Sequence, residues 1–362
     1  MPAPSFVKSV VRTCLRIGKQ DRVVLSTWRH TLDLAEAFEM ECRRAGAQVH
    51  TAFVTDEVFY DRALNLPLEY LKIPDPFDLA LMDLATARIK ITGPEDPERL
   101  KKVPAERWVA LAEADKPFMD KFLQRRYRGA HINLGLVTPQ RARTYGFDYH
   151  AWKENAKTAL DVKYDEMQKR GKKLGDVLEK SHEVHITTSK GTDLTLTLED
   201  RPVHIYDGVV DDEDLEKGAT FVTLPSGSVQ LAPAETSANG TFVSDIPEPL
   251  MGFLIRNLKW TFKEGRVVSF EGGKNSEVLR ENWERSSGDK DRIGWLTIGI
   301  NPKAKSGFIH NQIVLGAATI GVGDNRELGG RNVSKWGMEI TSTEPTVELD
   351  GKTIVKRGEL TV

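Results

Sequence analysis

The stretch VVLSTWRHTLDLAEAFEMECRRAGAQVHTAFVT, residues 23–55, decides the fold of the first half of the chain. It begins with a short apolar run, VVLST, which predicts a buried strand. Residues 32–45 then place apolar side chains at helical spacing, and Gly46 follows as a helix cap. AQVHTAFVT, residues 47–55, predicts a second strand. This strand–helix–strand order predicts a parallel pair joined by a helical crossover.

Similar passages continue the pattern over the first 150 residues. Residues 5–18 predict an amphipathic helix, residues 77–91 a helix followed by a strand, and residues 107–114 another strand. We therefore expect an α/β domain with a parallel sheet over residues 1–150. No GxGxxG or Walker-type loop follows these strands, so the usual sequence signal of a nucleotide site is missing.

The sequence pattern changes in the second half. Residues 151–183 predict one long connecting helix. Over residues 184–362 the apolar positions alternate with a period of two, which is typical of strands. Turn sequences at 263–265 and 350–352 predict hairpins, and one helix is expected near residues 275–285. The second half is thus predicted as a β-rich α+β domain.

The composition is that of an ordinary globular protein. Its 51 basic residues nearly balance 53 acidic ones, which argues against a dedicated nucleic-acid surface. No apolar run approaches the ~18 residues needed to cross a bilayer, and the N-terminal segment is too polar for a signal peptide. We expect a cytoplasmic protein in which Cys14 and Cys42 are reduced core thiols.

Residues 329–340, GGRNVSKWGMEI, have a glycine pair, a polar turn and alternating positions that lead into a strand, a pattern typical of a metal-binding segment. They contain neither histidine nor aspartate. Of the eight histidines in the chain, only His310 lies beyond residue 204. His310 falls in GFIHNQ, which predicts an exposed hairpin turn. A metal site that needs two imidazoles from the last part of the chain cannot be built from these residues.

Several longer blocks carry a family resemblance. They are GPEDPERLKKVPAERW (93–108), SKGTDLTLTLEDR (189–201), LPSGSVQLAPAETSANGTFVSD (224–245), RIGWLTIGINPKAKSG (292–307), VLGAATIGVGDNRELGG (314–330) and EPTVELDGKTIVKRGEL (344–360). In this order they resemble the thermophilic aminopeptidases, a metallopeptidase family that includes aminopeptidase T. The resemblance implies an N-terminal α/β domain, a β-rich catalytic domain and a homodimer. It also implies two divalent metals that activate water and polarise a peptide carbonyl.

The ligand positions that the resemblance implies carry other residues here. The family pattern is two glutamates, a histidine, a tyrosine and a closing His-x-Asp pair. In the same order this chain has Ser228, Trp295, Thr319, Arg326 and, for the pair, Gly337 with Glu339 or, in a shifted register, Lys335 with Gly337. Among these side chains only the Glu339 carboxylate is a donor for a hard or borderline cation. We therefore expect no metal and no other cofactor.

A second branch of the same fold, the dihydroxypyridine dioxygenases, also resembles this chain. That resemblance implies one iron held by two histidines and an aspartate. Trp295 matches the tryptophan that follows the RIG-like glycine in this branch, but the first iron histidine falls on Arg292. The closing pair again falls on residues 335–339 and is absent. The chain thus departs from both metal patterns.

The substituted positions suggest a different kind of site. Cationic residues there would suit a carboxylate, with Glu339 and Asp324 as their partners, although solvated loop charges or internal ion pairs explain them equally well. Trp295 and Trp336 fit either a ligand wall or a structural core. Ser228, Thr319 and Lys335 would be a nucleophile and base only with an activation geometry that the sequence does not show. The candidate ligand-binding residues are Ser228, Arg292, Trp295, Thr319, Arg326, Arg331, Lys335 and Glu339.

Three functions remain open. The first is a metal-independent protein that binds a peptide or small carboxylate in the C-terminal cleft. The second is a divergent enzyme, a hydrolase, lyase or ring-opening enzyme, that uses the same cleft. The third is a genuine metallo-aminopeptidase, which the histidine count disfavours. Expected partners are the ligand and a second copy of the chain, with neither nucleic acid nor membrane.

Overall fold

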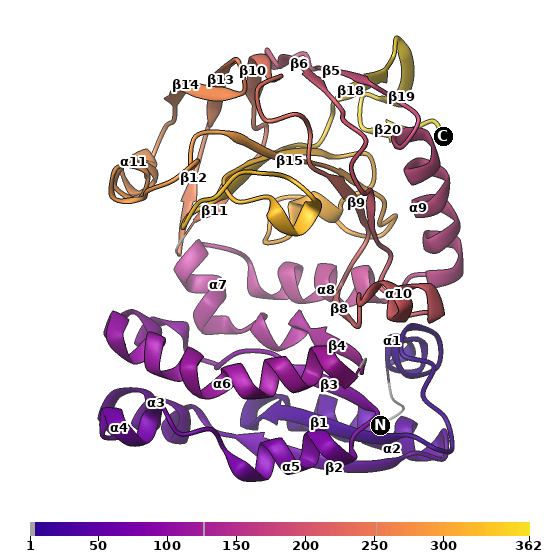
Figure 1. Ribbon diagram of the computed structural model, residues 1–362, viewed down its shortest axis with the longest axis vertical. Helices are drawn as coiled ribbons and strands as arrows, with labels where there is room; N and C mark the ends of the chain where they lie inside the picture. The colour runs from indigo at the N-terminus through magenta and orange to yellow at the C-terminus, as the bar shows by residue number, and fades with distance from the viewer. Residues whose placement is uncertain (1–3, 126, 251) are drawn as a thin grey trace. The chain divides into compact units, whose positions relative to one another are not determined.

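The computed structural model describes residues 4–125, 127–250 and 252–362 (Figure 1). The chain divides into two compact units. The first comprises Met1–Tyr164 and Gly208–Pro225, and the second comprises Asp165–Asp207 and Ser226–Val362. The chain therefore enters the second unit, returns to the first, and then enters the second again.

The first unit is built on a five-stranded sheet in the order β2-β1-β3-β4-β8. Every neighbouring pair in this sheet is parallel, which confirms the predicted α/β fold with a parallel sheet. The strands are β1 (Arg22–Trp28), β2 (Gln48–Val54), β3 (Ala87–Ile91), β4 (Arg128–Ile132) and β8 (Phe221–Leu224).

Helices connect these strands, and their bounds agree with the sequence only in part. The expected helix over 5–18 is α1 (Ser5–Ser9) followed by one π-helical segment (Val10–Cys14). The other helices of this unit are α2 (Leu32–Arg44), α3 (Asp56–Asn65), α4 (Leu68–Leu71), α5 (Pro76–Leu84), α6 (Ala105–Arg125), α7 (Pro139–Tyr145), α8 (Tyr149–Leu160) and α10 (Asp212–Lys217).

Two predicted elements of the first half are wrong. Residues 107–114 were predicted as a strand but lie within α6, where the buried Ala110 and Ala114 are four residues apart, as on one face of a helix. The single helix predicted over 151–183 is two helices, α8 and α9 (Tyr164–Leu178). The break follows Leu160, where the backbone of Asp161 leaves the helical conformation.

The return segment also differs from the prediction. The sequence groups β8 with the strands of the β-rich half, but β8 pairs in parallel with β4 at the edge of the first sheet. The sequence of an apolar strand does not indicate which sheet the strand joins, because side chains alternate with a period of two residues in both sheets.

The second unit is almost entirely antiparallel. Its sheets have the orders β14-β13-β10-β6-β5-β18-β19-β20, β17-β16-β15-β9-β7 and β11-β12. The predicted helix near 275–285 is confirmed as α11 (Ser276–Arg285). The strands are β5 (Glu183–Thr187), β6 (Asp193–Thr197), β7 (His204–Tyr206), β9 (Ser228–Leu231), β10 (Asn239–Val243), β11 (Glu248–Leu250), β12 (Phe253–Ile255), β13 (Lys259–Lys263), β14 (Arg266–Glu271), β15 (Ile293–Gly299), β16 (Ala318–Val322), β17 (Met338–Ser342), β18 (Thr346–Leu349), β19 (Lys352–Lys356) and β20 (Glu359–Leu360).

Both predicted hairpin turns are confirmed. Glu264 and Gly265 connect β13 to β14 with φ of 50° and 78°, and Asp350 and Gly351 connect β18 to β19 with φ of 49° and 79°. Left-handed backbone at both central residues is the geometry of the tight turns that match the twist of paired strands.

The five-stranded sheet β17-β16-β15-β9-β7, here the C-terminal sheet, has one apolar face. The apolar side chains of that face include Val229, Leu231, Leu296, Ile298 and Ile320, which the strand registers place beside one another, although most residues of the central strands are buried on both faces. The intervening residues point to the opposite face, because side chains alternate along a strand. That opposite face carries the predicted site positions.

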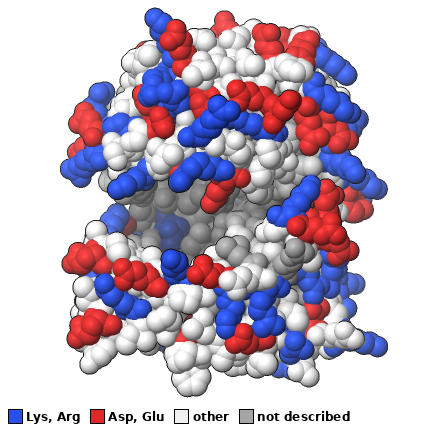
Figure 2. Space-filling model, viewed as in Figure 1, with Lys and Arg blue, Asp and Glu red and all other residues white. Residues whose placement is uncertain are grey.

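The surface carries charges of both signs. Figure 2 shows lysine and arginine side chains interspersed with aspartate and glutamate on the face in view, in keeping with the formal net charge of −2. None of the helices within the described ranges is long and apolar enough to span a membrane.

Candidate site on the C-terminal sheet

The C-terminal sheet brings four of the predicted positions onto neighbouring strands. Ser228 lies on β9, Trp295 on β15, Thr319 on β16 and Glu339 on β17. The antiparallel registers place all four on the same face of the sheet. We call this surface the polar face; it comprises Ser228, Gln230, Trp295, Thr297, Thr319, Glu339 and Thr341.

The indole of Trp295 lies across the strands that carry the implied ligand positions. Trp295 is opposite Gly321 on β16, and Gly321 is opposite Glu339 on β17. A Cβ on Gly321 would lie 1.9 Å from the indole Cε2, and one on Gly337 would lie 3.3 Å from its Cη2. Both glycines therefore make room for the ring.

Glu339 is the hydrogen-bond partner of this indole. Trp295 Nε1 donates to Glu339 Oε2 over 2.9 Å. Burial raises the pKa of Glu339, and the bond from the indole opposes that rise. The one carboxylate among the implied ligands is thus engaged by a neutral aromatic donor rather than by one of the predicted cations.

A row of hydroxyl and amide groups crosses the sheet beside the indole. Gln230, Thr297, Thr319 and Thr341 lie opposite one another on β9, β15, β16 and β17. Gln230 Nε2 donates to Thr297 Oγ1 over 3.1 Å, and the hydroxyl oxygens of Thr319 and Thr341 are 2.9 Å apart. The row is uncharged and supplies both donors and acceptors.

The structure gives no nucleophile–base pair among Ser228, Thr319 and Lys335. The Thr319 hydroxyl bonds another hydroxyl, and Lys335 is exposed on the loop before β17. Within the described ranges, no hydrogen bond joins any two of these three residues. The hypothesis of an activated hydroxyl therefore has no geometric support.

A buried carboxyl that sequence reasoning missed lies next to the row. Glu248 Oε1 on β11 accepts bonds from the Thr341 backbone N–H, over 2.5 Å, and from Ser244 Oγ, over 2.7 Å. Burial raises the pKa of Glu248 to about 8, although both bonds favour the charged form. Its sequence context, DIPEPL, holds no signal for such a position.

The predicted cations separate into two groups. Arg292 pairs with Asp289 over 3.4 Å, and Arg326 pairs with Asp324 over 2.7 Å, so both belong to internal ion pairs. Arg331 and Lys335 are exposed, and neither side chain forms an ion pair with any residue that the structure describes. Trp336, the second predicted wall residue, makes an edge contact with Trp283, their ring centroids 5.6 Å apart.

Buried asparagines shape the segment 329–340. Asn332 donates its backbone N–H to Asn325 Oδ1 over 2.8 Å, and its side-chain amide to the Ile293 carbonyl over 2.8 Å. A Cβ on Gly330 would lie 2.1 Å from Asn325 Cγ, so the chain turns tightly around that amide. These bonds satisfy the backbone of the loop and fix its path into β17.

Glu235 holds the other side of this loop. It accepts hydrogen bonds from the two terminal guanidinium nitrogens of Arg201, each over 2.7 Å, and from the Arg331 backbone N–H over 2.7 Å. Burial favours the neutral acid, but these bonds hold the pKa of Glu235 at about 2. Sequence reasoning missed this buried pair, because its partners are far apart along the chain.

His310 differs from its prediction. It was expected to be exposed in a hairpin turn, but it is half-buried and precedes the short 3-10 helix Asn311–Ile313 with a φ of 72°. Burial lowers its pKa to about 4. The imidazole is therefore neutral at physiological pH.

The donors at the implied ligand positions do not fit a two-metal centre. Such a centre needs several anionic or imidazole donors that converge, whereas this face offers a serine, an indole, a threonine, a glycine and one engaged carboxylate. Across residues 4–125, 127–250 and 252–362, no group of three or more His, Cys, Asp or Glu side chains is arranged to hold a metal ion.

Comparisons with solved structures agree with this fold. Aminopeptidase AmpT from Thermus thermophilus superposes with a TM-score of 0.78 at 20% identity, covering 100% of this chain and 99% of that one. The 2,5-dihydroxypyridine dioxygenase from Pseudomonas putida KT2440 superposes with a TM-score of 0.65 at 15% identity, covering 99% and 97%. At these identities the likeness shows the fold alone, which confirms the predicted fold class.

Curated relatives match over shorter stretches. The 2,5-dihydroxypyridine 5,6-dioxygenase of Pseudomonas putida is 21% identical over 199 residues, which is 51% of this chain and 55% of that protein. Aminopeptidase AmpS of Bacillus subtilis is 31% identical over 101 residues, 28% of this chain and 24% of that protein. The chain thus spans about half and about a quarter of the lengths of these two relatives.

The family comparison covers most of the chain. The family model described as thermophilic metalloprotease (M29) matches residues 4–302. The matched range covers the first unit from residue 4 and part of the second unit, and it ends before Thr319 and Glu339. Since the match covers well over half of the chain, and the predicted resemblance is thereby confirmed, this protein belongs to the M29 family of thermophilic metalloproteases.

Proposed function

We propose that this chain is a metal-independent member of the M29 family that binds a peptide or small carboxylate at the polar face of its C-terminal sheet. The supporting observation is the Trp295 indole, which lies against Gly321 and Gly337 and bonds the Glu339 carboxylate. A cation held by Glu339 would compete with this hydrogen bond, and the neighbouring positions supply no replacement donors.

The chemistry of the polar face suits a peptide. The half-buried Gln230 offers an amide that matches the donors and acceptors of a peptide backbone, and the buried Thr297 accepts a hydrogen bond that positions this amide. The half-buried Trp295 offers an aromatic surface for an apolar side chain. Arg331 and Lys335, the two predicted cations without an ion pair in the described chain, would bind the ligand carboxylate.

Glu248 favours a second candidate, a divergent hydrolase. A carboxyl with a pKa of about 8 is protonated at neutral pH and has the range of a general acid. Glu248 touches the same strand, β17, through Thr341. A screen of aminoacyl anilides, run with and without added zinc, cobalt and manganese, separates the two functions. Turnover by the wild type that is lost in the Glu248→Gln variant would show that the protein is a hydrolase and not only a binding protein.

Elemental analysis tests the metal-independent part. The protein is purified without chelator, dialysed against metal-free buffer and measured for zinc, cobalt, manganese and iron. We expect less than ~0.1 equivalent of each, since a tight site needs three or more convergent donors. Near-stoichiometric metal would overturn the metal-independent part of the proposal and would favour a metallopeptidase instead.

Calorimetric titration with tri-alanine tests the binding part. Arg331→Ala or Lys335→Ala should weaken binding about tenfold, the size of one charge-assisted hydrogen bond. Lys356→Ala, which removes an exposed lysine on β19, serves as the control and should bind as the wild type does. Equal affinities in all four proteins would refute the role of the two cations.

A further inference from the structure

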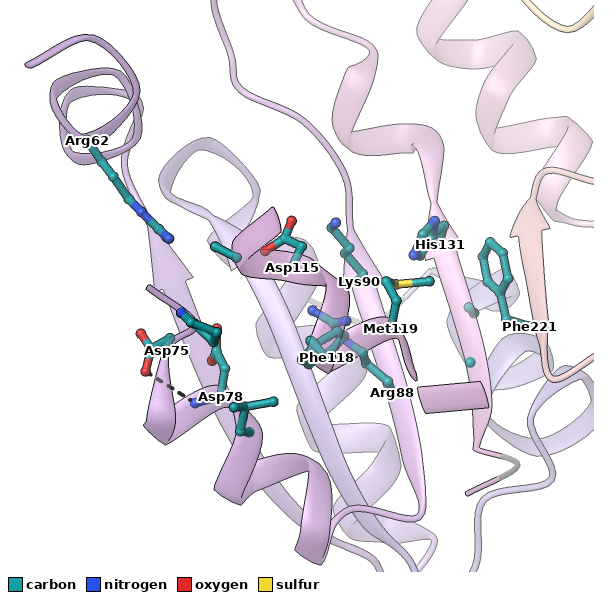
Figure 3. A pocket seen from close by; sticks show the side chains of 15 residues that line it. Arg62, Asp75, Asp78, Arg88, Lys90, Asp115, Phe118, Met119, His131 and Phe221 are labelled. Atoms are coloured by element: carbon teal, nitrogen blue, oxygen red, sulfur yellow. Dashed lines mark hydrogen bonds between the residues drawn. The ribbon is translucent and has the colours of Figure 1, made fainter. Parts of the chain in front are cut away.

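The first unit contains a cavity that the polar face does not involve. It has a volume of about 220 Å³ and lies between the strands β3, β4 and β8 and the helices α5 and α6. Figure 3 shows the side chains of Arg88, Lys90 and His131 extending from the sheet into this space. These three residues come from adjacent parallel strands, since Lys90 is opposite His131.

The inner wall of the cavity is basic; the exposed Asp78 and Asp115 act on its cations electrostatically but lie too far away to form ion pairs with them in the described chain. Arg88 Nε is buried without a hydrogen-bond acceptor. Neither Arg88 nor Lys90 forms a side-chain ion pair with a residue in the described part of the chain. Burial is the main cause that lowers the pKa of both groups. Arg88 and Lys90 are half-buried, and a partly desolvated cation without an ion pair is costly, so the carboxylate of a ligand would compensate that cost.

Aromatic and apolar side chains line the rest of the cavity. The Arg88 guanidinium carbon lies 4.4 Å from the centroid of the Phe118 ring, and the rings of His131 and Phe221 are 4.3 Å apart. Met119 and Phe221 also line the cavity, and both side chains are partly open to solvent. These surfaces would pack against the flat faces of a ring.

The size and charge of the cavity narrow the class of ligand. A cavity of roughly 150 Å³ holds benzene, so this volume accommodates a single ring with a small substituent. Three carboxylates, of Asp75, Asp78 and Asp115, also line the cavity and are exposed (Figure 3). They would repel a ligand with several negative charges, such as a nucleoside polyphosphate. His131 adds hydrogen-bonding capacity without charge, because burial lowers its pKa to about 4.

We propose that this cavity is a binding site for a monocarboxylate that carries one ring or a short apolar chain. The carboxylate would accept hydrogen bonds from Arg88 and Lys90, and the apolar body would lie against Phe118 and Phe221. A guanidinium edge matches the two oxygens of a carboxylate. The site lies wholly within the first unit and is independent of the function proposed for the C-terminal sheet.

Titration calorimetry on the full chain tests this site with benzoate, its neutral analogue benzyl alcohol, and inorganic phosphate. We expect benzoate to bind with a Kd on the order of 0.1–1 mM, typical of a ligand of this size. The other two probes should bind at least about tenfold more weakly, because one lacks charge and the other lacks the ring. Benzyl alcohol binding as well as benzoate, phosphate binding more tightly, or no benzoate binding at 10 mM would each overturn the proposal.

Substitutions of the cavity cations test whether benzoate binds in this cavity. Arg88→Met and Lys90→Met should each weaken benzoate at least about tenfold. Arg44→Met, which removes an exposed arginine at the end of α2 in the same unit, should have no effect. Unchanged affinity in both cavity variants would place benzoate elsewhere and refute the site.

A thermal melt without ligand separates a binding role from a structural one. Removing a half-buried charge that has no ion-pair partner in the described chain should leave the Tm of Arg88→Met equal to or above that of the wild type. A marked fall in Tm, or failure to fold, in both Arg88→Met and Lys90→Met would show that the cations hold the unit together, and would overturn the proposal.

Discussion

The two main sheets of this protein differ in whether the charged side chains on them have internal partners. Around the C-terminal sheet, Glu339 is bonded by Trp295, and Glu235 is bonded by Arg201 and a backbone N–H. On the N-terminal sheet, Arg88 and Lys90 face a cavity without an ion pair in the described chain. The comparison teaches that buried or half-buried carboxylates around one sheet are held by internal hydrogen bonds, whereas the cations on the other sheet face a cavity without forming an ion pair in the described chain.

The largest expected effect comes from restoring donors to the polar face. A variant with Ser228→Glu, Trp295→Glu, Thr319→His and Gly337→His, together with the native Glu339, should bind about one zinc ion or more per chain. The reason is that Ser228, Trp295, Thr319 and Glu339 already share one face of the sheet, and Gly337 lies against the Trp295 ring. Metal content by elemental analysis and zinc titration would measure the change.

The control for this variant carries Gln, Gln, Asn and Asn at the same four positions and should bind no zinc. If the four-donor variant stays metal-free as well, the polar face lacks the geometry of a metal centre and not only the donors. The contrast between the two sheets would then need a different explanation.

Breaking the buried ion pair of the second unit should give the next largest effect. Arg201→Ala leaves the Glu235 carboxylate buried and without its guanidinium, which should cost roughly 3–5 kcal/mol of unfolding free energy. Urea denaturation measures the loss. Arg285→Ala, which removes an exposed pair with Glu281, should change the unfolding free energy by less than about 0.5 kcal/mol. Similar values for both variants would contradict the importance of internal pairing.

The pH dependence of stability should reveal the raised pKa of Glu248. The folded state keeps this carboxyl protonated up to pH about 8, whereas its ordinary value is 4.5. Between these values the folded state binds the extra proton, so this group makes stability fall as the pH rises from 4.5 to 8. Glu248→Gln should therefore stabilise the protein more at pH 8 than at pH 5. Unfolding curves at both pH values measure the change, with Glu344→Gln, at an exposed position, as the control. An equal effect of Glu248→Gln at pH 5 and pH 8 would contradict the raised pKa.

The smallest effect is expected from the indole bond itself. Trp295→Phe keeps a ring beside Gly321 but removes the donor to Glu339. The loss should cost about 1–2 kcal/mol of unfolding free energy, because a half-buried carboxylate loses its partner. Trp108→Phe, at an exposed position of α6, is the matched control. No difference between the two would mean that Glu339 is satisfied by water.

The sequence predicted those parts of the fold that local chemistry determines. The passage 23–55 contains a strand, a capped helix and a strand, and the turns at 263–265 and 350–352 contain the residues that left-handed backbone requires. It failed where tertiary context decides. Residues 107–114 are apolar enough for either period, and the break after Leu160 contains neither proline nor glycine.

The candidate site was predictable in part for the same reason. Motif positions alone placed Ser228, Trp295, Thr319 and Glu339 together, and the strand registers agree. The indole–carboxylate bond, the raised pKa of Glu248 and the loop around Asn325 depend on segments that meet only in three dimensions. The basic cavity had no signal either, because Arg88 and Lys90 alternate within a strand as solvent-facing residues normally do.

The late arrival of β8 affects how the protein is made. During synthesis, β8 can pair with β4 only after the chain has been made as far as Leu224. Until then the edge of β4 lacks this partner, including the time in which residues 165–207 of the second unit are made. An open edge is a template for pairing with other chains. A truncation that stops at Tyr164 would keep that edge permanently, which makes the first unit alone a poor candidate for separate expression.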